Sequence, residues 1–417
     1  MTTFAIVVFG SLMAFVVVQA GLVAGFVGSL ARFSRPRLAD VDCPRAAVVL
    51  CLRGGDPFLP ACIDALLNQD YPRYDVHIIV DSSADPAAGI VDAALRQHST
   101  DNVHVHVLRE PKTTCSLKCS SLVQVVRDLA GSCDVMAQLD ADVVPHATWL
   151  RELVAPLKKP HVGAATGNRW YMPGKPTWGS MIRYFWNSAA VVQMYWYRIA
   201  WGGTLAVKTQ VFHESKLLER WSQAFCEDTM LFRELKTMGL EIEFVPSLMM
   251  INRETCDTSG FFRWVRRQLL TARLYHPRWF LVAGHGILTS LLPAIAVGLA
   301  VAGWMRQQDD VVLWCVSGLA AYQLALLPAP LLMERFVRRI ARARHESDRW
   351  LTAAAIWKWC WALPMTQVVY AGALLSSLTL RRVAWRGVTY RIQSAWRVRL
   401  EEYRPYSNDD VDQTASL

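Results

Sequence analysis

Three long stretches of this 417-residue chain contain no Asp, Glu, Lys or Arg, and they constrain the fold more than any other feature. They are residues 1–31, 279–305 and 311–333. Each is longer than the roughly 18–20 residues that a helix needs to cross a bilayer core. The first is too long for a signal-peptide core and has no basic residues before it, so we expect a retained anchor over 1–31 rather than a cleaved signal. Residues 279–333 are expected to form a transmembrane hairpin.

The region between the anchor and the hairpin has a mixed composition and is long enough for one sizeable soluble domain, at residues 40–278. Ten cysteines are scattered through the chain, and the pair Cys115 and Cys119 has no second pair to match it. This pattern indicates neither a zinc site nor a disulfide framework, and it is typical of reduced thiols in the cytosol.

The formal net charge is +9, and much of it lies beside the apolar stretches. Two arginine clusters stand out: Arg335, Arg338, Arg339, Arg342, Arg344 and Arg349, then Arg381, Arg382, Arg386, Arg391, Arg397 and Arg399. Positive residues beside spans mark the cytoplasmic side, so we expect the soluble domain, a basic loop at 334–350 and a basic tail at 381–417 to be cytoplasmic. Juxtamembrane charge favours anionic lipid head groups as partners over nucleic acid.

Residues 351–380 create a conflict, because one further span there would place the basic tail outside. The segment carries Lys358 and Pro364 near its middle. We therefore favour a re-entrant or interfacial helical pair broken at Pro364, since proline removes a helical hydrogen bond, with an ordinary span as the alternative. The polar end, Ser407–Leu417, is expected to be disordered.

Within the soluble domain, short apolar runs alternate with segments of helical spacing. Strands are predicted at 46–52, 76–80, 103–108 and 135–139, and helices at 56–70 and 116–129. This alternation predicts an α/β domain with a doubly wound parallel sheet.

Carboxylates follow two of these strands directly. Asp81 follows the second, and Asp140-Ala141-Asp142 follows the fourth. Because the carboxyl ends of parallel strands share one edge, these side chains can converge on one crevice. There Asp140 and Asp142 can hold a divalent cation on a diphosphate, and Asp81 can accept from a nucleobase or ribose. The alternative is a solvated turn for the pair and a turn or helix N-cap for Asp81.

Two further motifs follow the fourth strand. Gly202-Gly203 indicates a tight turn where the backbone approaches a ligand closely, or else a plain hairpin. Glu227-Asp228 is predicted to open a helix, where acidic residues stabilise the helix dipole, but a carboxylate at a pocket rim can also deprotonate a hydroxyl.

The segment 261–275 mixes arginines with aromatic residues just before the second apolar stretch. It is either an interfacial helix anchored at head-group level or a source of cations that stabilise a leaving diphosphate. Arg263 and Trp264 begin the charged part, and Gln268 and Arg273 follow one and two turns later.

Taken in order, these motifs resemble the membrane-bound family 2 glycosyltransferases, in particular the ceramide glucosyltransferase group and its bacterial relatives, which include hopanoid-associated sugar transferases. The family pattern is a nucleotide-binding Asp, an Asp-X-Asp, a Gly-Gly, a Glu-Asp and a Gln/Arg-X-X-Arg-Trp. The matches are Asp81, Asp140/Asp142, Gly202/Gly203, Glu227/Asp228 and Arg263-Trp264, with Lys118 at the family's lysine before a helix and Trp385-Arg386-Gly387 in the tail. Gly260 departs from the pattern, so either the motif is degenerate or its role passes to Arg267-Gln268 and Arg273 one or two turns later.

The resemblance implies a GT-A domain, an inverting mechanism and a UDP-sugar donor, with glucose or N-acetylglucosamine as the sugar. It implies Mg²⁺ or Mn²⁺ on Asp140 and Asp142, uridine on Asp81, and Asp228 as the base, with Glu227 the next candidate. Few membrane segments follow the domain, so we expect one transfer to a membrane lipid, ceramide-like or hopanoid, in the bacterial inner membrane. The alternatives are a processive polysaccharide synthase and, from another class, a non-catalytic membrane scaffold.

Overall fold

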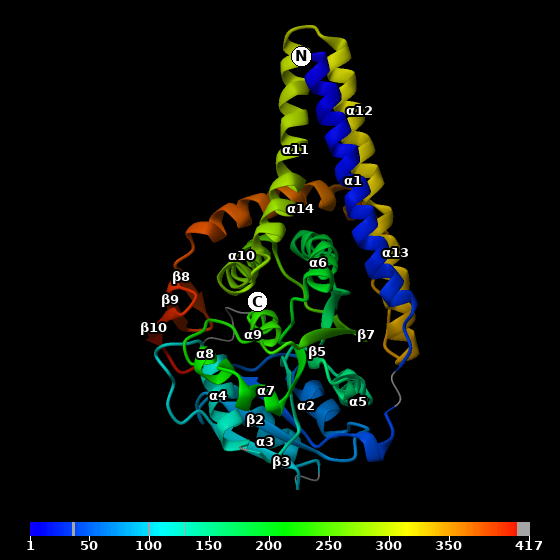
Figure 1. Cartoon of the computed structure of the whole chain (residues 1–417). Helices are drawn as coiled ribbons and strands as arrows, with labels where there is room; N and C mark the ends of the chain where they lie inside the picture. The colour runs from blue at the N-terminus through cyan, green and yellow to red at the C-terminus, as the bar shows by residue number, and fades with distance from the viewer. Residues whose placement is uncertain (36–37, 99–100, 130, 407–417) are drawn as a thin grey trace.

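The computed structural model describes residues 1–35, 38–98, 101–129 and 131–406. Figure 1 shows a rounded α/β body from which three long helices rise side by side. They are α1 (Thr2–Ala31), α11 (Trp279–Met305) and α12 (Asp309–Leu326), the last continued by α13 (Pro328–Ala343). Within the described chain these three are long and apolar enough to cross a membrane.

A seven-stranded sheet forms the centre of the body, in the order β3-β2-β1-β4-β6-β5-β7. Its strands are β1 (Ala46–Leu52), β2 (Tyr74–Val80), β3 (Val103–Val107), β4 (Val135–Leu139), β5 (Val162–Tyr171), β6 (Thr204–Lys208) and β7 (Glu241–Asn252). The β1, β2, β3 and β4 strands are mutually parallel, as the sequence predicted, while β6 runs antiparallel to both β4 and β5. The sheet is therefore mixed, and its dominant direction is parallel.

Helices cover both faces of this sheet. They are α2 (Leu59–Leu67), α3 (Pro86–Leu95), α4 (Leu117–Leu129), α5 (Trp149–Val154), α6 (Trp178–Tyr197), α7 (Thr209–Glu214), α8 (Leu217–Trp221), α9 (Leu231–Thr237) and α10 (Thr258–Tyr275), with short 3₁₀ turns at Asp40–Asp42 and Ala155–Lys158. Side chains of a strand alternate between faces, so Val49 of β1 packs with α4 while Val48 packs with α2. Burial on both faces explains why these strands are continuous apolar runs.

The break predicted at Pro364 is wrong, because α14 (Ala353–Thr379) is one helix that contains this proline. Figure 1 shows α14 lying crosswise to the three long helices, over α6 and α10, while α1 and α13 continue alongside the body. Its buried residues Trp359 and Thr366 pack among residues of α6, and Tyr370 packs with α10 and α11. A helix packed on several sides keeps its course when proline removes a single hydrogen bond.

The predicted basic loop at 334–350 is also wrong in its first half, because α13 continues to Ala343. Arg335, Arg339 and Arg342 are exposed on this helix. Its buried side carries Glu334, which accepts hydrogen bonds from the indoles of Trp170 and Trp350, both at 2.7 Å. This carboxylate therefore ties the end of the third long helix to strand β5.

The tail forms a small antiparallel sheet that the sequence did not predict: β8 (Arg382–Trp385), β9 (Val388–Ser394) and β10 (Arg397–Tyr403). Its apolar side chains, Val388 and Tyr390 among them, join the core beside α4. The Tyr390 hydroxyl accepts a hydrogen bond from the Leu117 backbone N–H at 3.0 Å. The tail is thus part of the soluble body, while the predicted disorder of Ser407–Leu417 lies outside the described residues.

Candidate active site

A cavity of about 270 Å³ lies at the sheet edge where β1, β2 and β4 end. Asp81 follows β2, Asp140 and Asp142 follow β4, and Gly202 precedes the antiparallel strand β6, so chain direction brings all of them to this edge. The cavity lining includes Asp81, Lys118, Asp140, Asp142, Gly202, Glu227, Asp228, Trp264 and Gln268 from the predicted set, and Arg53, Arg169, Arg267 and Arg386 in addition.

Lys118 links two of the carboxylates. Its Nζ lies 2.7 Å from Asp140 Oδ1 and 2.7 Å from Glu227 Oε1. Burial alone would raise the pKa of Asp140, but the cations Lys118 and Arg169 outweigh burial and hold that pKa below its usual value. Glu227 is 4% exposed, and burial raises its pKa. Asp140 is therefore a stable anion, while Glu227 is a buried partner of Lys118.

Asp142 has a different environment. Its Oδ2 accepts from Asn252 Nδ2 at 3.1 Å and lies 3.8 Å from Arg169, while its buried Oδ1 has no hydrogen-bond partner. Burial, with a smaller contribution from Asp140, raises the pKa of Asp142 to about 6. A buried carboxylate oxygen without a partner suits a cation that brings its own charge.

A metal ion here would depend on oxygens from a ligand as well. Among the described residues no group of three or more His, Cys, Asp or Glu side chains forms a metal-binding cluster. Mg²⁺ in proteins is commonly held by one or two carboxylates together with substrate phosphates and water. Asp140 and Asp142 fit such an ion, but they do not form a complete protein cage for it.

Asp81 lies under the tail sheet. Its Oδ2 is ion-paired with Arg53, its backbone carbonyl accepts from the Tyr403 hydroxyl at 3.3 Å, and its buried Oδ1 has no partner. Burial raises the pKa of Asp81 to about 6, although Arg53 acts in the opposite direction. Arg53 is itself held by backbone carbonyls of Arg386 and Arg404. The tail therefore fixes the surroundings of this carboxylate.

The turn before β6 holds Asp228 in place. The Gly202 N–H donates to Asp228 Oδ2 at 2.8 Å, and the Thr229 N–H and hydroxyl donate to Oδ1 at 2.6 and 2.9 Å. A Cβ on Gly202 would lie 2.1 Å from Glu227 Oε1, so only glycine fits. Gly203 stays outside the cavity lining, against the Trp201 ring. Asp228 is half-buried, and helix α9 begins three residues after it, at Leu231.

Helix α10 presents a different arginine from the one in the motif. Trp264, Arg267 and Gln268 line the cavity, and burial followed by Arg169 and Arg386 lowers the pKa of Arg267 to about 10. Arg263 instead points to Ser259 one turn earlier, at 3.3 Å. Arg273 donates to backbone carbonyls at the end of α14. The structure therefore does not bring Arg263 and Arg273 to the cavity.

Arg169 is a site residue that the sequence analysis missed. Its guanidinium lies 4.7 Å from the ring centre of Trp201 and 5.6 Å from that of Trp264, and 4.0 Å from Asp140. It lies near the end of β5, a strand that the sequence analysis did not predict. An arginine inside the segment 162–171, whose other residues are mostly small or apolar, was the available signal, since an arginine is rarely buried without a function or a partner.

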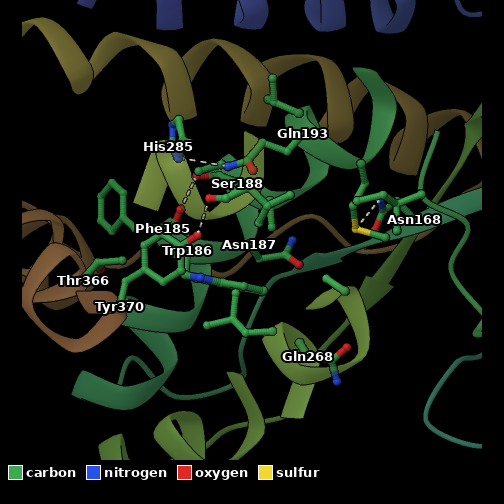
Figure 2. Close-up of a pocket in the computed structure, with 18 of the residues that line it drawn as sticks. Asn168, Phe185, Trp186, Asn187, Ser188, Gln193, Gln268, His285, Thr366 and Tyr370 are labelled. Carbon is green, nitrogen blue, oxygen red and sulfur yellow. Dashed lines mark hydrogen bonds between the residues drawn. The ribbon is translucent and has the colours of Figure 1, made fainter. Parts of the chain in front are cut away.

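A second, largely apolar cavity of about 200 Å³ adjoins the first, among α1, α6, α10, α11, α13 and α14 (Figure 2). The two cavities share Arg169, Trp201, Asp228, Trp264 and Gln268 in their linings. Asp228 therefore faces a charged cavity on one side and an apolar cavity, bounded by membrane-type helices, on the other.

This arrangement of fold and carboxylates agrees with the comparison with protein families. The model of glycosyl transferase family 21 matches residues 4–398. The chain belongs to glycosyl transferase family 21. The ceramide glucosyltransferase of Komagataella phaffii is 28% identical over 141 residues, 31% of this chain and 26% of that protein. The match thus spans about a quarter of the length of this relative, and it confirms the resemblance to the ceramide glucosyltransferase group.

Two solved structures are similar to this family 21 chain. A mannosyltransferase from Pyrobaculum calidifontis, in complex with GDP-Man and Mn²⁺, has a TM-score of 0.50 at 17% identity, covering 89% of this chain and 99% of that one. Glucosyl-3-phosphoglycerate synthase from Mycobacterium tuberculosis, with Mn²⁺ and UDP, has a TM-score of 0.37 at 14% identity, covering 57% and 83%. The similarity to the mannosyltransferase confirms the expected GT-A fold.

Proposed function

We propose that the protein transfers a single sugar from a UDP-sugar, glucose or N-acetylglucosamine, to a hydroxyl of a membrane lipid, with inversion at the anomeric carbon. One observation carries this proposal: a charged cavity and an apolar cavity meet at the carboxylate of Asp228. The first suits a nucleotide diphosphate, and the second suits a lipid whose chains remain among the membrane helices.

The charged cavity supports the donor half of the reaction. Lys118, Arg169 and Arg267 line it, and fixed cations stabilise the charge that develops on a departing diphosphate. Asp81 would accept from uracil or ribose through its unpartnered Oδ1. Asp140 and Asp142 would hold Mg²⁺ or Mn²⁺, which when bound neutralises diphosphate charge. The Mn²⁺ in the Pyrobaculum mannosyltransferase supports this ligand class.

Asp228 is the proposed base. Hydrogen bonds from Gly202 and Thr229 fix its carboxylate while one side remains open to both cavities. It takes the proton of the acceptor hydroxyl as the oxygen attacks the anomeric carbon opposite the diphosphate. Glu227 holds Lys118 and accepts from Gln138 Nε2 at 3.1 Å, so it positions the site rather than acting as the base.

The apolar cavity favours a lipid over a growing polymer. It is walled by Phe185, Trp186, Leu269, Val282 and Tyr370 among other apolar residues, which offer few partners to a sugar chain. A membrane lipid presents one hydroxyl at the head-group layer while its chains stay in hydrocarbon. Helix α14 and the exposed arginines of α13 suit the cytoplasmic face of a membrane, and we propose the bacterial inner membrane as the location.

The test is a transfer assay in membranes that contain the protein. A panel of radiolabelled nucleotide sugars, UDP-glucose, UDP-N-acetylglucosamine and GDP-mannose, is incubated with wild-type or Asp228→Asn membranes, and lipids are extracted into chloroform–methanol. We expect label from one UDP-sugar in a monoglycosylated lipid with the wild type alone. Label in a long aqueous polymer would favour the polysaccharide synthase, label from GDP-mannose alone would refute the UDP donor, and no incorporation would refute the proposal.

A further inference from the structure

The apolar cavity contains a buried polar pair that the family motifs do not include. Gln193 of α6 and His285 of α11 lie 3.0 Å apart, Nε2 to Nδ1, and both line the cavity. Figure 2 shows this pair across the cavity from Gln268. Gln193 is 7% exposed, and its Oε1 is buried without a hydrogen-bond partner.

A histidine within a membrane-type helix is costly and usually serves a function. His285 is not needed to hold α11 against its neighbours, because α11 already packs on α14 through Gly286 and Tyr370. An unpartnered amide oxygen in an apolar cavity adds a second cost, which a ligand with a hydrogen-bond donor would remove. Two independent features of the cavity therefore indicate a polar ligand group at this position.

The chemistry of the pair defines that group. If the Gln193 amide donates to His285 Nδ1, the neutral imidazole carries its proton on Nε2, so the free groups are an acceptor on Gln193 and a donor on His285. If the amide is turned over, the roles exchange, and the pair again offers at least one free donor and one free acceptor. The complementary ligand is a group that both donates and accepts, such as a secondary amide or a hydroxyl.

We infer that Gln193 and His285 bind a second polar group of the acceptor, distinct from the hydroxyl that Asp228 deprotonates, and that they select lipids with a hydrogen-bond donor there. This inference rests on the proposed lipid acceptor. The linings place the reacting hydroxyl beside Asp228, where the cavities meet, and the second group deeper among the membrane helices. The pair acts on acceptor choice and does not contact the nucleotide.

The experiment compares matched acceptors in detergent-solubilised full-length enzyme. The acceptors are a long-chain 2-amino-1,3-diol acylated on nitrogen, its N-methyl amide, its 3-deoxy analogue and a diacylglycerol. The N-methyl compound lacks the amide donor, and the deoxy compound lacks the second hydroxyl. Gln193→Leu and His285→Phe are tested with Gln193→Asn as the conservative variant. Gln323→Leu is the control, because it removes a half-buried amide of the same helical bundle that lies outside the cavity lining and reaches it only through a hydrogen bond to Gln367.

We expect the wild type to prefer one donor-bearing acceptor over its donor-less analogue by about tenfold, the value of one hydrogen bond. Gln193→Leu and His285→Phe should abolish that preference through a higher KM for the donor-bearing lipid, with an unchanged KM for the UDP-sugar. Gln193→Asn should recover part of it, and Gln323→Leu should retain it. Comparison of the N-methyl and the 3-deoxy acceptors identifies whether the pair binds the amide or the second hydroxyl.

An unchanged preference in both Gln193→Leu and His285→Phe would overturn the inference and leave the proposed function standing, because lipids are still glycosylated. Equal use of all four acceptors by the wild type would also overturn it. If the wild type glycosylates no lipid at all, the proposed function fails, and the inference fails with it.

Discussion

Glu227 and Asp228 are neighbours in the chain, yet their carboxylates have different partners. Glu227 is enclosed by Lys118 and Gln138, whereas Asp228 accepts from Gly202 and Thr229 and still faces both cavities. Asp228→Asn keeps the size of the side chain but removes its basicity and one of its two accepting oxygens. Turnover should therefore fall about 10²–10⁴-fold while UDP-sugar binding survives. Stopped transfer assays and nucleotide titration measure the two effects. A loss of less than tenfold would assign the base elsewhere.

Asp142 allows a prediction about pH. Its pKa in the folded protein is about 6, above the usual 3.8, so the native state binds a proton more tightly than the unfolded chain between these values. Stability contributed by this group therefore falls as pH rises from about 4 to 6, and is lowest above 6. Divalent-ion affinity should show the opposite trend, weakening as pH falls through 6.

Asp142→Asn tests both trends, because asparagine has no charge to bury. At pH 7.5 without metal the variant should melt at a higher temperature than the wild type, yet transfer no sugar. Calorimetric titration of Mn²⁺ with UDP between pH 5 and 7.5 should lose its pH dependence in the variant. Transfer by the wild type that is insensitive to EDTA would contradict a metal role for this residue.

At the scale of elements, runs of apolar residues predicted the core of the fold well. The strands at 46–52 and 135–139 have the bounds expected from sequence, because a buried parallel strand is an unbroken apolar run. The Pro364 break failed because tertiary packing outweighs one missing hydrogen bond. The tail sheet was not predicted, because its strands contain many arginines and few apolar residues. Such a composition indicates a basic tail rather than strands of a packed sheet.

In the candidate site too, residues fixed by local sequence could be predicted, and residues placed by tertiary packing could not. Residues directly after strands, such as Asp81 and Asp140, could be placed because strand direction alone decides where they lie. Arg169 could not, since its place depends on the path of β5. Arg267 was only one of several candidates, because the sequence does not say which face α10 turns toward the sheet. The family motif suggested Arg263, and the helical rotation of α10 presents Arg267 instead.

The tail sheet supports a prediction of its own. Arg386 lines the charged cavity and lies 3.5 Å from Asp56, whereas Arg391 in the same sheet is exposed and paired with Glu401. Arg386→Ala should raise the KM for UDP-sugar about tenfold with a small change in kcat, because it removes a charge from donor binding. Arg391→Ala is the matched control and should behave like the wild type. Equal kinetics in the two variants would exclude a donor role for the tail.

For the whole molecule, the arrangement of helices predicts sidedness. The turn between α11 and α12 lies at the far end of the long helices from the body, which includes the tail sheet (Figure 1). Cys360 is the exposed native thiol of the described chain, so it is first replaced by Cys360→Ser. In that background, single cysteines introduced by Gln307→Cys and Arg391→Cys should react with a membrane-impermeant maleimide from opposite sides of the membrane. Labelling of both from one side would exclude this membrane arrangement.

The charged cavity is completed only late in the synthesis of the chain. Asp81 and Asp140 leave the ribosome before the hairpin α11–α12, whereas Arg386 and Tyr390, which complete the same cavity, leave it afterwards. A nascent chain therefore has no finished nucleotide pocket until its membrane helices have been synthesised and can already be inserted. Under the proposed function, we therefore expect a chain that lacks its tail to bind nucleotide sugar weakly.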